Sequence, residues 1–133
     1  MKRSILIAED DAMLRGLYAK KFSYAGYEIR TAADGEEALK MLSEQKPDLF
    51  ICDIRMPKVD GFGVLEKWPR SSRTFPIIVL TNFDQEDYRK RGEELGMDGY
   101  FVKKNMTIHS LLDMAETLLR MREDSGGDHK PLG

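Results

Sequence analysis

Short apolar segments alternate along the chain with longer segments in which apolar residues recur every three or four positions. Several short segments lack the polar and apolar alternation of a half-exposed strand, which is typical of strands in a parallel sheet covered by helices on both faces. We therefore predict an α/β fold, a doubly wound (βα)5 domain with a five-stranded parallel sheet. The predicted strands are residues 4–8, 27–31, 49–52, 77–80 and 99–102, and the predicted helices are residues 12–24, 36–44, 62–68, 85–95 and 108–122.

Local signals for the ends of helices support this pattern. Gly26 and Gly96 follow the first and fourth helical segments, where glycine commonly ends a helix. Asp34 and Thr107 precede the second and fifth segments, and their side chains suit the capping of free amides in a first turn. Pro47 separates the second helix from the third strand. Periodicity and local chemistry thus predict the same boundaries.

The composition is that of an ordinary globular domain. Of the 133 residues, 41% are hydrophobic and 33% are charged, and the formal net charge is −2. This balance favours neither nucleic acid nor a membrane as a directly contacted partner. The single cysteine, Cys52, excludes a disulfide within the chain and a cysteine-based zinc site. The apolar run near the N-terminus is too short for a signal peptide or a membrane span, so we expect one cytoplasmic domain.

Polar residues stand where the predicted strands end, which is where ligands of doubly wound sheets bind. Glu9 and Asp10 follow the first strand, Asp53 the third, Thr81 the fourth and Lys103 the fifth. Carboxylates without histidine or cysteine are the hard oxygen ligands that Mg²⁺ prefers. A lysine and a hydroxyl beside them can bind phosphoryl oxygens. The set predicts a phosphoryl site at which Asp53 is the nucleophile and is itself modified.

These residues also have ordinary structural explanations. Asp10 or Asp11 could cap the helix that follows them, Thr81 could be a turn hydroxyl, and Lys103 could be a solvated charge. Asp53 ends the central apolar run, and burying a carboxylate there is costly unless it is compensated. Their joint placement at one edge favours the phosphoryl site.

Four segments, ILIAEDD, ICDIRMPKVDG, IIVLTN and DGYFVKK, resemble in order and spacing the receiver domain of two-component response regulators, of the chemotaxis type. The resemblance extends from about residue 4 to residue 122. It implies a flavodoxin-like sheet with strand order 2-1-3-4-5. It also implies a receiver domain at residues 1–123, with residues 124–133 as a disordered tail, a linker stub or an expression remnant.

The resemblance gives Asp53 the role of phospho-acceptor. It implies that the carboxylates of Glu9, Asp10 and Asp53 hold Mg²⁺, together with the backbone carbonyl of Arg55. In this family, phosphorylation is followed by movements of a hydroxyl and an aromatic side chain that change a protein-binding surface.

Thr81 and Lys103 match the residues that bind the phosphoryl oxygens in the family, and Tyr100 matches the switch aromatic. The resemblance implies that Thr81 moves inward and that Tyr100 rotates in behind it. This is a packing change driven by new local charge. Tyr100 could instead be an ordinary half-buried aromatic residue of a strand.

The sequence departs from the family pattern at two positions. Lys104 stands where the family usually has a proline, often with a cis bond, which makes the aim of Lys103 uncertain. Asn82 stands where the family usually has a small residue, so it could narrow access to the acceptor or add an amide near the phosphate. Arg55 and Phe83 lie where the family varies and where the approach of hydrolytic water is affected. We expect these four residues to tune donor access and phosphate lifetime.

The function expected from these observations is that of a receiver in a phosphorelay. It takes a phosphoryl group from a histidine kinase or phosphotransfer protein, is not an enzyme in its own right, and signals to an unidentified protein target. Dimerisation on phosphorylation, through the last helix–strand–helix face, is left open. One alternative is a pseudo-receiver, an interaction module without phosphoryl turnover. A haloacid-dehalogenase-like phosphatase is disfavoured, because that class has a second aspartate where Arg55 stands.

Overall fold

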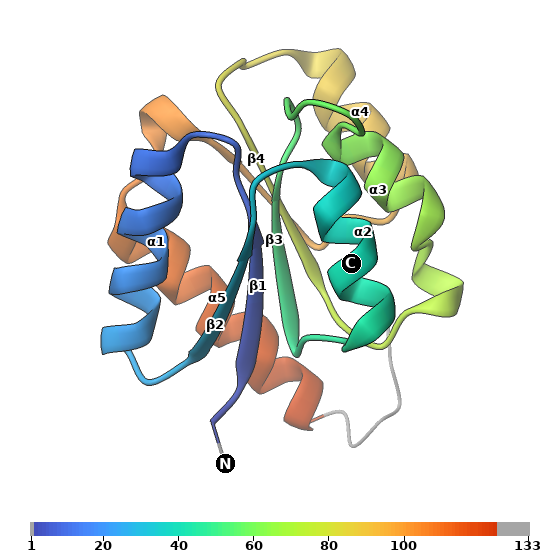
Figure 1. Ribbon diagram of the computed structural model, residues 1–133. Helices are drawn as coiled ribbons and strands as arrows, with labels where there is room; N and C mark the ends of the chain where they lie inside the picture. The colour runs from blue at the N-terminus through green and yellow to red at the C-terminus, as the bar shows by residue number, and fades with distance from the viewer. Residues whose placement is uncertain (1, 125–133) are drawn as a thin grey trace.

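The computed structural model describes residues 2–124, which form one parallel sheet between two layers of helices (Figure 1). The strands lie in the order β2-β1-β3-β4-β5, and every neighbouring pair is parallel. This confirms the predicted doubly wound fold and its strand order. The strands are β1 (Ser4–Ala8), β2 (Glu28–Ala32), β3 (Leu49–Asp53), β4 (Ile77–Thr81) and β5 (Gly99–Val102).

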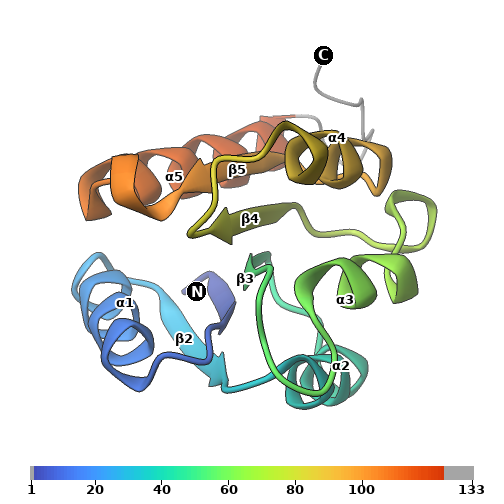
Figure 2. The same cartoon turned by 90° about the horizontal axis from the view of Figure 1, so that it is seen from above.

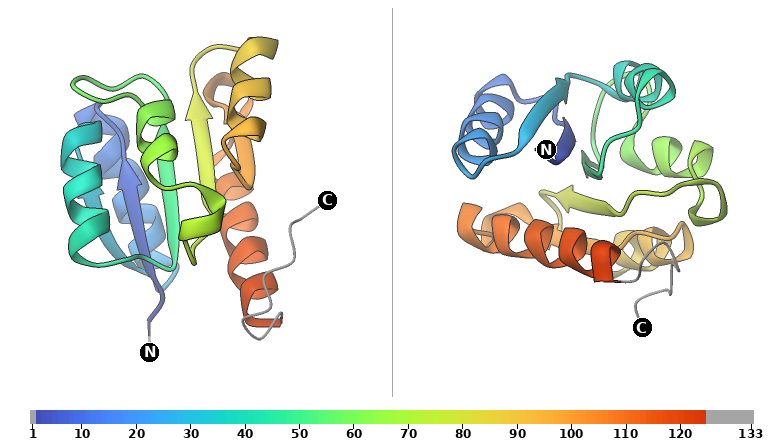
Figure 3. Two further views of the ribbon diagram at one scale, coloured as in Figure 1. Left: turned by 90° about the vertical axis from the view of Figure 1, so that its right-hand side faces the viewer. Right: turned by 90° about the horizontal axis from the view of Figure 1, so that it is seen from below.

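The helices divide between the two faces of the sheet. Views from above and below show α1 and α5 on one face and α2, α3 and α4 on the other (Figures 2 and 3). None of the described helices is both long and apolar enough to span a bilayer. The helices are α1 (Ala12–Tyr24), α2 (Gly35–Glu44), α3 (Gly61–Lys67), α4 (Glu86–Glu94) and α5 (Ile108–Asp124), and η1 (Arg70–Ser72) and η2 (Lys103–Asn105) are short 3₁₀ turns.

The predicted boundaries agree with the structure to within two residues. Asp53 and Thr81 are the last residues of β3 and β4 rather than the first residues of loops. α5 continues to Asp124, so the predicted domain boundary after residue 123 falls inside its last turn. The rest of the predicted tail lies outside the described residues.

Successive residues of each strand face opposite helical layers. In β1, Ile5 and Ile7 pack in the cluster that contains residues of α1 and α5, whereas Leu6 and Ala8 pack with residues of α2 and α3. All four are fully buried. Both faces of the sheet are therefore core, which explains why the strands read as apolar runs.

Aspartates begin three of the helices. The carboxylate of Asp11 accepts hydrogen bonds from the amides of Met13 and Leu14, so Asp11 caps α1. Asp34 caps α2 and Asp60 caps α3 in the same manner. Of the two neighbouring acids that could cap α1, Asp11 does so, and the carboxylate of Asp10 is not used in this cap.

The predicted cap of α5 is also present. Thr107 Oγ1 accepts a hydrogen bond from the amide of Ser110 at 3.0 Å, and Ser110 Oγ accepts one from the amide of Thr107 at 3.0 Å. The two side chains satisfy each other's backbone donors, as in a capping box. This reciprocal pair fixes the start of α5 close to the end of β5.

The loop between β3 and α3 contains a strained residue. Lys58 has a φ of 71° and is the one non-glycine residue with positive φ among residues 2–124. Its ammonium lies 3.7 Å from a carboxylate oxygen of Asp34, but the exposure of the lysine makes this ion pair weak. The left-handed conformation costs an L-residue about 1–2 kcal/mol. The loop that follows Asp53 therefore carries backbone strain.

We expect Lys58→Gly to raise the free energy of unfolding by about 0.5–1 kcal/mol, because relief of the left-handed strain exceeds the extra chain entropy of an unfolded glycine. Urea denaturation followed by circular dichroism measures the change. Lys58→Ala is the matched control, since it removes the same ion pair and keeps the strain. Equal stabilisation by the two substitutions would contradict this explanation.

Candidate functional site

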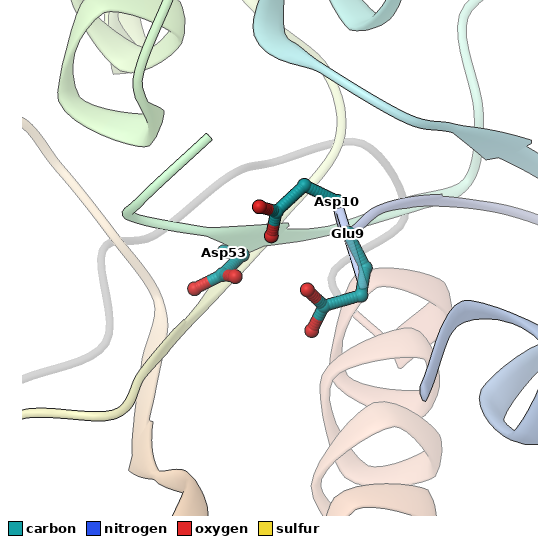
Figure 4. A group of neighbouring side chains, drawn as sticks. All are labelled: Glu9, Asp10 and Asp53. Carbon is teal, nitrogen blue, oxygen red and sulfur yellow. The ribbon is translucent and has the colours of Figure 1, made fainter. Parts of the chain in front are cut away.

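Three carboxylates converge at the carboxyl ends of β1 and β3 (Figure 4). Glu9 and Asp10 come from the β1–α1 loop, and Asp53 ends β3. Carboxylate oxygens from the three residues all lie within 4.8 Å of one another. The exposed fractions of Glu9 and Asp53 are 0% and 2%, whereas Asp10 is exposed. The sheet thus brings two buried acids and one exposed acid together in an arrangement that could hold a metal ion.

The alternation of strand residues explains which side chains meet. In β3, every second residue before Asp53 packs against the layer of α1 and α5, so Asp53 faces that layer as well. Glu9 and Lys103 stand two residues beyond apolar residues of β1 and β5 that face the same layer. Thr81 has the opposite parity and faces the layer of α2, α3 and α4. Because side chains alternate between the two faces of a strand, the face of each of these residues follows from its position once the strand ends are known.

Lys103 joins the buried acids. Its Nζ lies 2.5 Å from Oε1 of Glu9 and 3.0 Å from Oδ2 of Asp53. The peptide bonds of residues 2–124 are all trans, so lysine reaches the carboxylates without the cis bond that the family often has before its proline. Lys104 itself is exposed. The predicted uncertainty about the aim of Lys103 is resolved in favour of direct contact with Asp53.

Burial and neighbouring charges shift the pKa values of Glu9, Asp53 and Lys103. Burial raises the pKa of Glu9 to about 7, against the opposing effect of its hydrogen bond from Lys103. Burial also raises the pKa of Asp53. Burial alone would lower the pKa of Lys103, but the hydrogen bond to Glu9 and the charge of Asp53 raise it above its usual value. Lys103 therefore stays charged at neutral pH, while Glu9 is part protonated.

Thr81 and Tyr100 lie outside the acidic cluster. Thr81 is 1% exposed, and its Oγ1 accepts a hydrogen bond from the amide of Phe83 at 3.1 Å. Tyr100 packs on the α2–α4 side of the sheet, with the guanidinium of Arg89 5.2 Å from its ring centroid. Its hydroxyl is buried and has no hydrogen-bond partner within the described residues. The two predicted switch residues share one face of the sheet, and their switching role stays a prediction.

The four predicted tuning residues follow β3, β4 and β5 in the chain and fall into two pairs. The guanidinium carbon of Arg55 lies 4.4 Å from the ring centroid of Phe83, which joins the loops after β3 and β4. Asn82 and Lys104 line a hollow of about 380 Å³ that also borders Lys103. The stacking of Arg55 on Phe83 was not predicted, because the contact joins two loops that are far apart in sequence. The predicted role of the Arg55 carbonyl as a metal ligand stays a prediction.

Comparison with known protein families identifies the family to which this fold and its acidic cluster belong. A model of the response regulator receiver domain matches residues 5–116, which include every residue of the acidic cluster and Lys103. The chain belongs to the response regulator receiver family. Receiver domains of this family serve two-component signalling, as the sequence motifs predict.

Similar proteins include transcriptional regulators. The "Probable transcriptional regulator ycf27" of Cyanophora paradoxa is 36% identical over 138 residues, covering 99% of this chain and 57% of that protein. The receiver spans about half the length of the curated relatives that it matches. Similar solved structures include the chemotaxis protein CheY4 of Vibrio cholerae, with a TM-score of 0.80, 29% identity and coverage of 89% of this chain and 99% of that chain.

A DNA-binding response regulator of the LuxR family from Staphylococcus aureus is equally similar. Its TM-score is 0.83 at 28% identity, with coverage of 88% of this chain and 98% of that chain. Relatives thus include both chemotaxis proteins and transcriptional regulators. The receiver identity is confirmed, but the prediction of a chemotaxis-type receiver in particular is not supported.

We expect Asp10→Asn to stabilise the metal-free receiver, because it removes a negative charge from the cluster of three acids without removing the contacts of Lys103. A gain of about 1 kcal/mol would raise the melting temperature by about 2–4 °C in the presence of EDTA. Calorimetry measures the shift, with Asp113→Asn on the exposed surface of α5 as the matched control. A lower melting temperature for Asp10→Asn would show that the cluster is not strained by repulsion.

Proposed function

We propose that this receiver accepts a phosphoryl group on Asp53 from the phosphohistidine of a kinase or phosphotransfer protein in the cytoplasm. The observation that carries the proposal is the pairing of the buried Asp53 carboxylate with Lys103, beside two further acids. An ionised carboxylate needs no base in order to attack phosphorus. Its oxygen bonds to phosphorus, the bond from phosphorus to the donor nitrogen breaks, and that nitrogen keeps the electron pair.

We further propose that Glu9, Asp10 and Asp53 hold Mg²⁺. The donor set fits this ion, because it consists of hard carboxylate oxygens with no histidine or cysteine among them. When bound, Mg²⁺ supplies positive charge to the phosphoryl oxygens. Lys103 supplies a second positive charge, already placed 3.0 Å from the attacking carboxylate. The chain then acts as a phospho-acceptor rather than as an enzyme with a separate substrate.

We propose that phosphorylation of Asp53 produces a signal by moving Thr81 and Tyr100. Phosphorylation of Asp53 adds negative charge that attracts the hydroxyl of Thr81, which now accepts only a backbone hydrogen bond within the described residues. Movement of Thr81 opens space for the partly buried Tyr100, whose hydroxyl lacks a partner there. The changed surface binds a protein target or a second receiver, and this chain contacts neither nucleic acid nor membrane directly.

A pseudo-receiver remains the second candidate. Asn82 and Lys104 border the hollow next to Lys103, and both differ from the family pattern. An asparagine in place of a small residue could restrict the approach of a donor. The direct contact of Lys103 with Asp53 favours phosphoryl transfer over this alternative.

Incubation with Mg²⁺ and acetyl phosphate should give a labile phosphoryl adduct that is detected by intact mass. Asp53→Asn should abolish the adduct, because the amide is a poor nucleophile. Asp113→Asn, which removes an exposed acid from α5, should leave it unchanged. Absence of both the adduct and Mg²⁺ binding in the unchanged chain would favour the pseudo-receiver.

The affinity for Mg²⁺ should increase with pH around neutrality. Since burial raises the pKa of Glu9 to about 7, the metal must displace a proton from this carboxyl below pH 7, and little proton displacement remains above pH 8. Calorimetric titration at pH 6, 7 and 8 should show weaker binding at each lower pH, with protons released at pH 6. An affinity that does not change between pH 6 and pH 8 would contradict the role of Glu9 as a ligand.

A further inference from the structure

Arg15 of α1 reaches back to the backbone of the acidic loop. Its Nη1 donates a hydrogen bond to the carbonyl oxygen of Glu9 at 2.9 Å and a longer one to that of Asp10 at 3.4 Å. These carbonyls belong to the two peptide units on either side of Asp10. The side chain is half-buried, so it lies along the protein rather than in solvent.

The helix dipole and the nearby acids act on the Arg15 guanidinium in opposite directions. Arg15 is the fourth residue of α1, and its guanidinium extends to the N-terminal end, where the helix dipole is positive. The capping carboxylate of Asp11 and the acids of the loop attract the guanidinium to this end. Both hydrogen bonds that the described residues offer the guanidinium are to carbonyls of the acidic loop. The hydrogen bonds of Arg15 therefore hold the backbone of the acidic loop and not that of α1.

The peptide unit between Asp10 and Asp11 is held at both ends. Arg15 binds its carbonyl oxygen, while its amide, that of Asp11, donates a hydrogen bond to Oε2 of Glu9 at 3.1 Å. The amide of Glu9 in turn donates to the carbonyl of Ala32 in β2 at 3.0 Å. The Glu9 carboxylate is thus held by the Asp11 amide through Oε2 and by Lys103 through Oε1. Asp10 lies between the two peptide units whose carbonyls Arg15 binds.

We propose that Arg15 is a positioning residue, which fixes the backbone of residues 9 and 10 so that the two carboxylates converge with Asp53 to bind a divalent cation. The proposal rests on the proposed function in that the cation is Mg²⁺. Residues that orient metal ligands through hydrogen bonds commonly change metal affinity about 10- to 100-fold when they are replaced. The role is indirect, since Arg15 contacts backbone atoms and not the ligand oxygens.

Whether cation affinity rises or falls when Arg15 is replaced by a neutral residue distinguishes a positioning role from a purely electrostatic one. Removing a positive charge near three carboxylates would by itself strengthen the binding of a cation. Loss of a positioning contact weakens it, because the carboxylates must then be ordered by the metal. The two explanations thus predict opposite changes for the same substitution.

The test is calorimetric titration of Mg²⁺ into the metal-free chain at pH 8. Arg15→Gln should weaken binding about tenfold, and Arg15→Lys, which keeps the charge but not the planar group, should weaken it less. Lys20→Gln removes an exposed charge from the same helix and should not weaken binding. The Mg²⁺ concentration for half-maximal phosphorylation by acetyl phosphate should rise with the dissociation constant in Arg15→Gln, while the rate at saturating Mg²⁺ is retained.

The positioning role would be overturned if both Arg15 variants bound Mg²⁺ at least as tightly as the unchanged chain does. If Arg15→Gln does not fold, Arg15→Lys decides, because electrostatics alone predicts no loss for it. Failure of the unchanged chain to bind Mg²⁺ would overturn both this inference and the proposed function. Normal phosphorylation of the unchanged chain, together with unaltered Arg15 variants, would overturn the inference alone.

Discussion

One ammonium group, that of Lys103, stabilises two buried carboxylates at the carboxyl edge of the sheet. Glu9 and Asp53 lose hydration when the sheet is covered by helices, and a buried carboxylate is tolerated only when it is paired. A third acid, Asp10, completes the group from the solvent side. The single lysine cannot neutralise all three, so the edge keeps negative charge. This excess of negative charge favours a bound cation, which is the basis of the proposed Mg²⁺ site.

Residues that are adjacent in the sequence have different contacts in the fold. Asp11 is used locally, to cap α1, whereas Asp10 is directed towards the other acids. The same separation occurs across the sheet, where strand parity places Asp53 on the side of α1 and α5 and Thr81 on the other side. Asp53 and Thr81 thus lie at the ends of neighbouring strands but belong to opposite helical layers.

The likeness to chemotaxis proteins and to transcriptional regulators has a physical explanation. The family match covers residues 5–116, which contain the sheet, the acidic cluster and Lys103. The similarity therefore rests on the sheet and the site residues, which do not distinguish a chemotaxis protein from a transcriptional regulator.

The sequence pattern by itself determined the fold class and the composition of the cluster, and the resemblance of its motifs to receiver domains implied the strand order. Apolar runs with helical segments between them permit few topologies, and parallel strands bring the residues at their ends, such as Asp53 and Lys103, to one edge. The tertiary structure decided whether Asp10 or Asp11 caps α1, that Lys103 reaches Asp53 through a trans peptide, and that Arg15 binds the acidic loop. Strand patterns are local, but the conformation of a loop and the rotamer of a long side chain depend on contacts with distant segments of the chain.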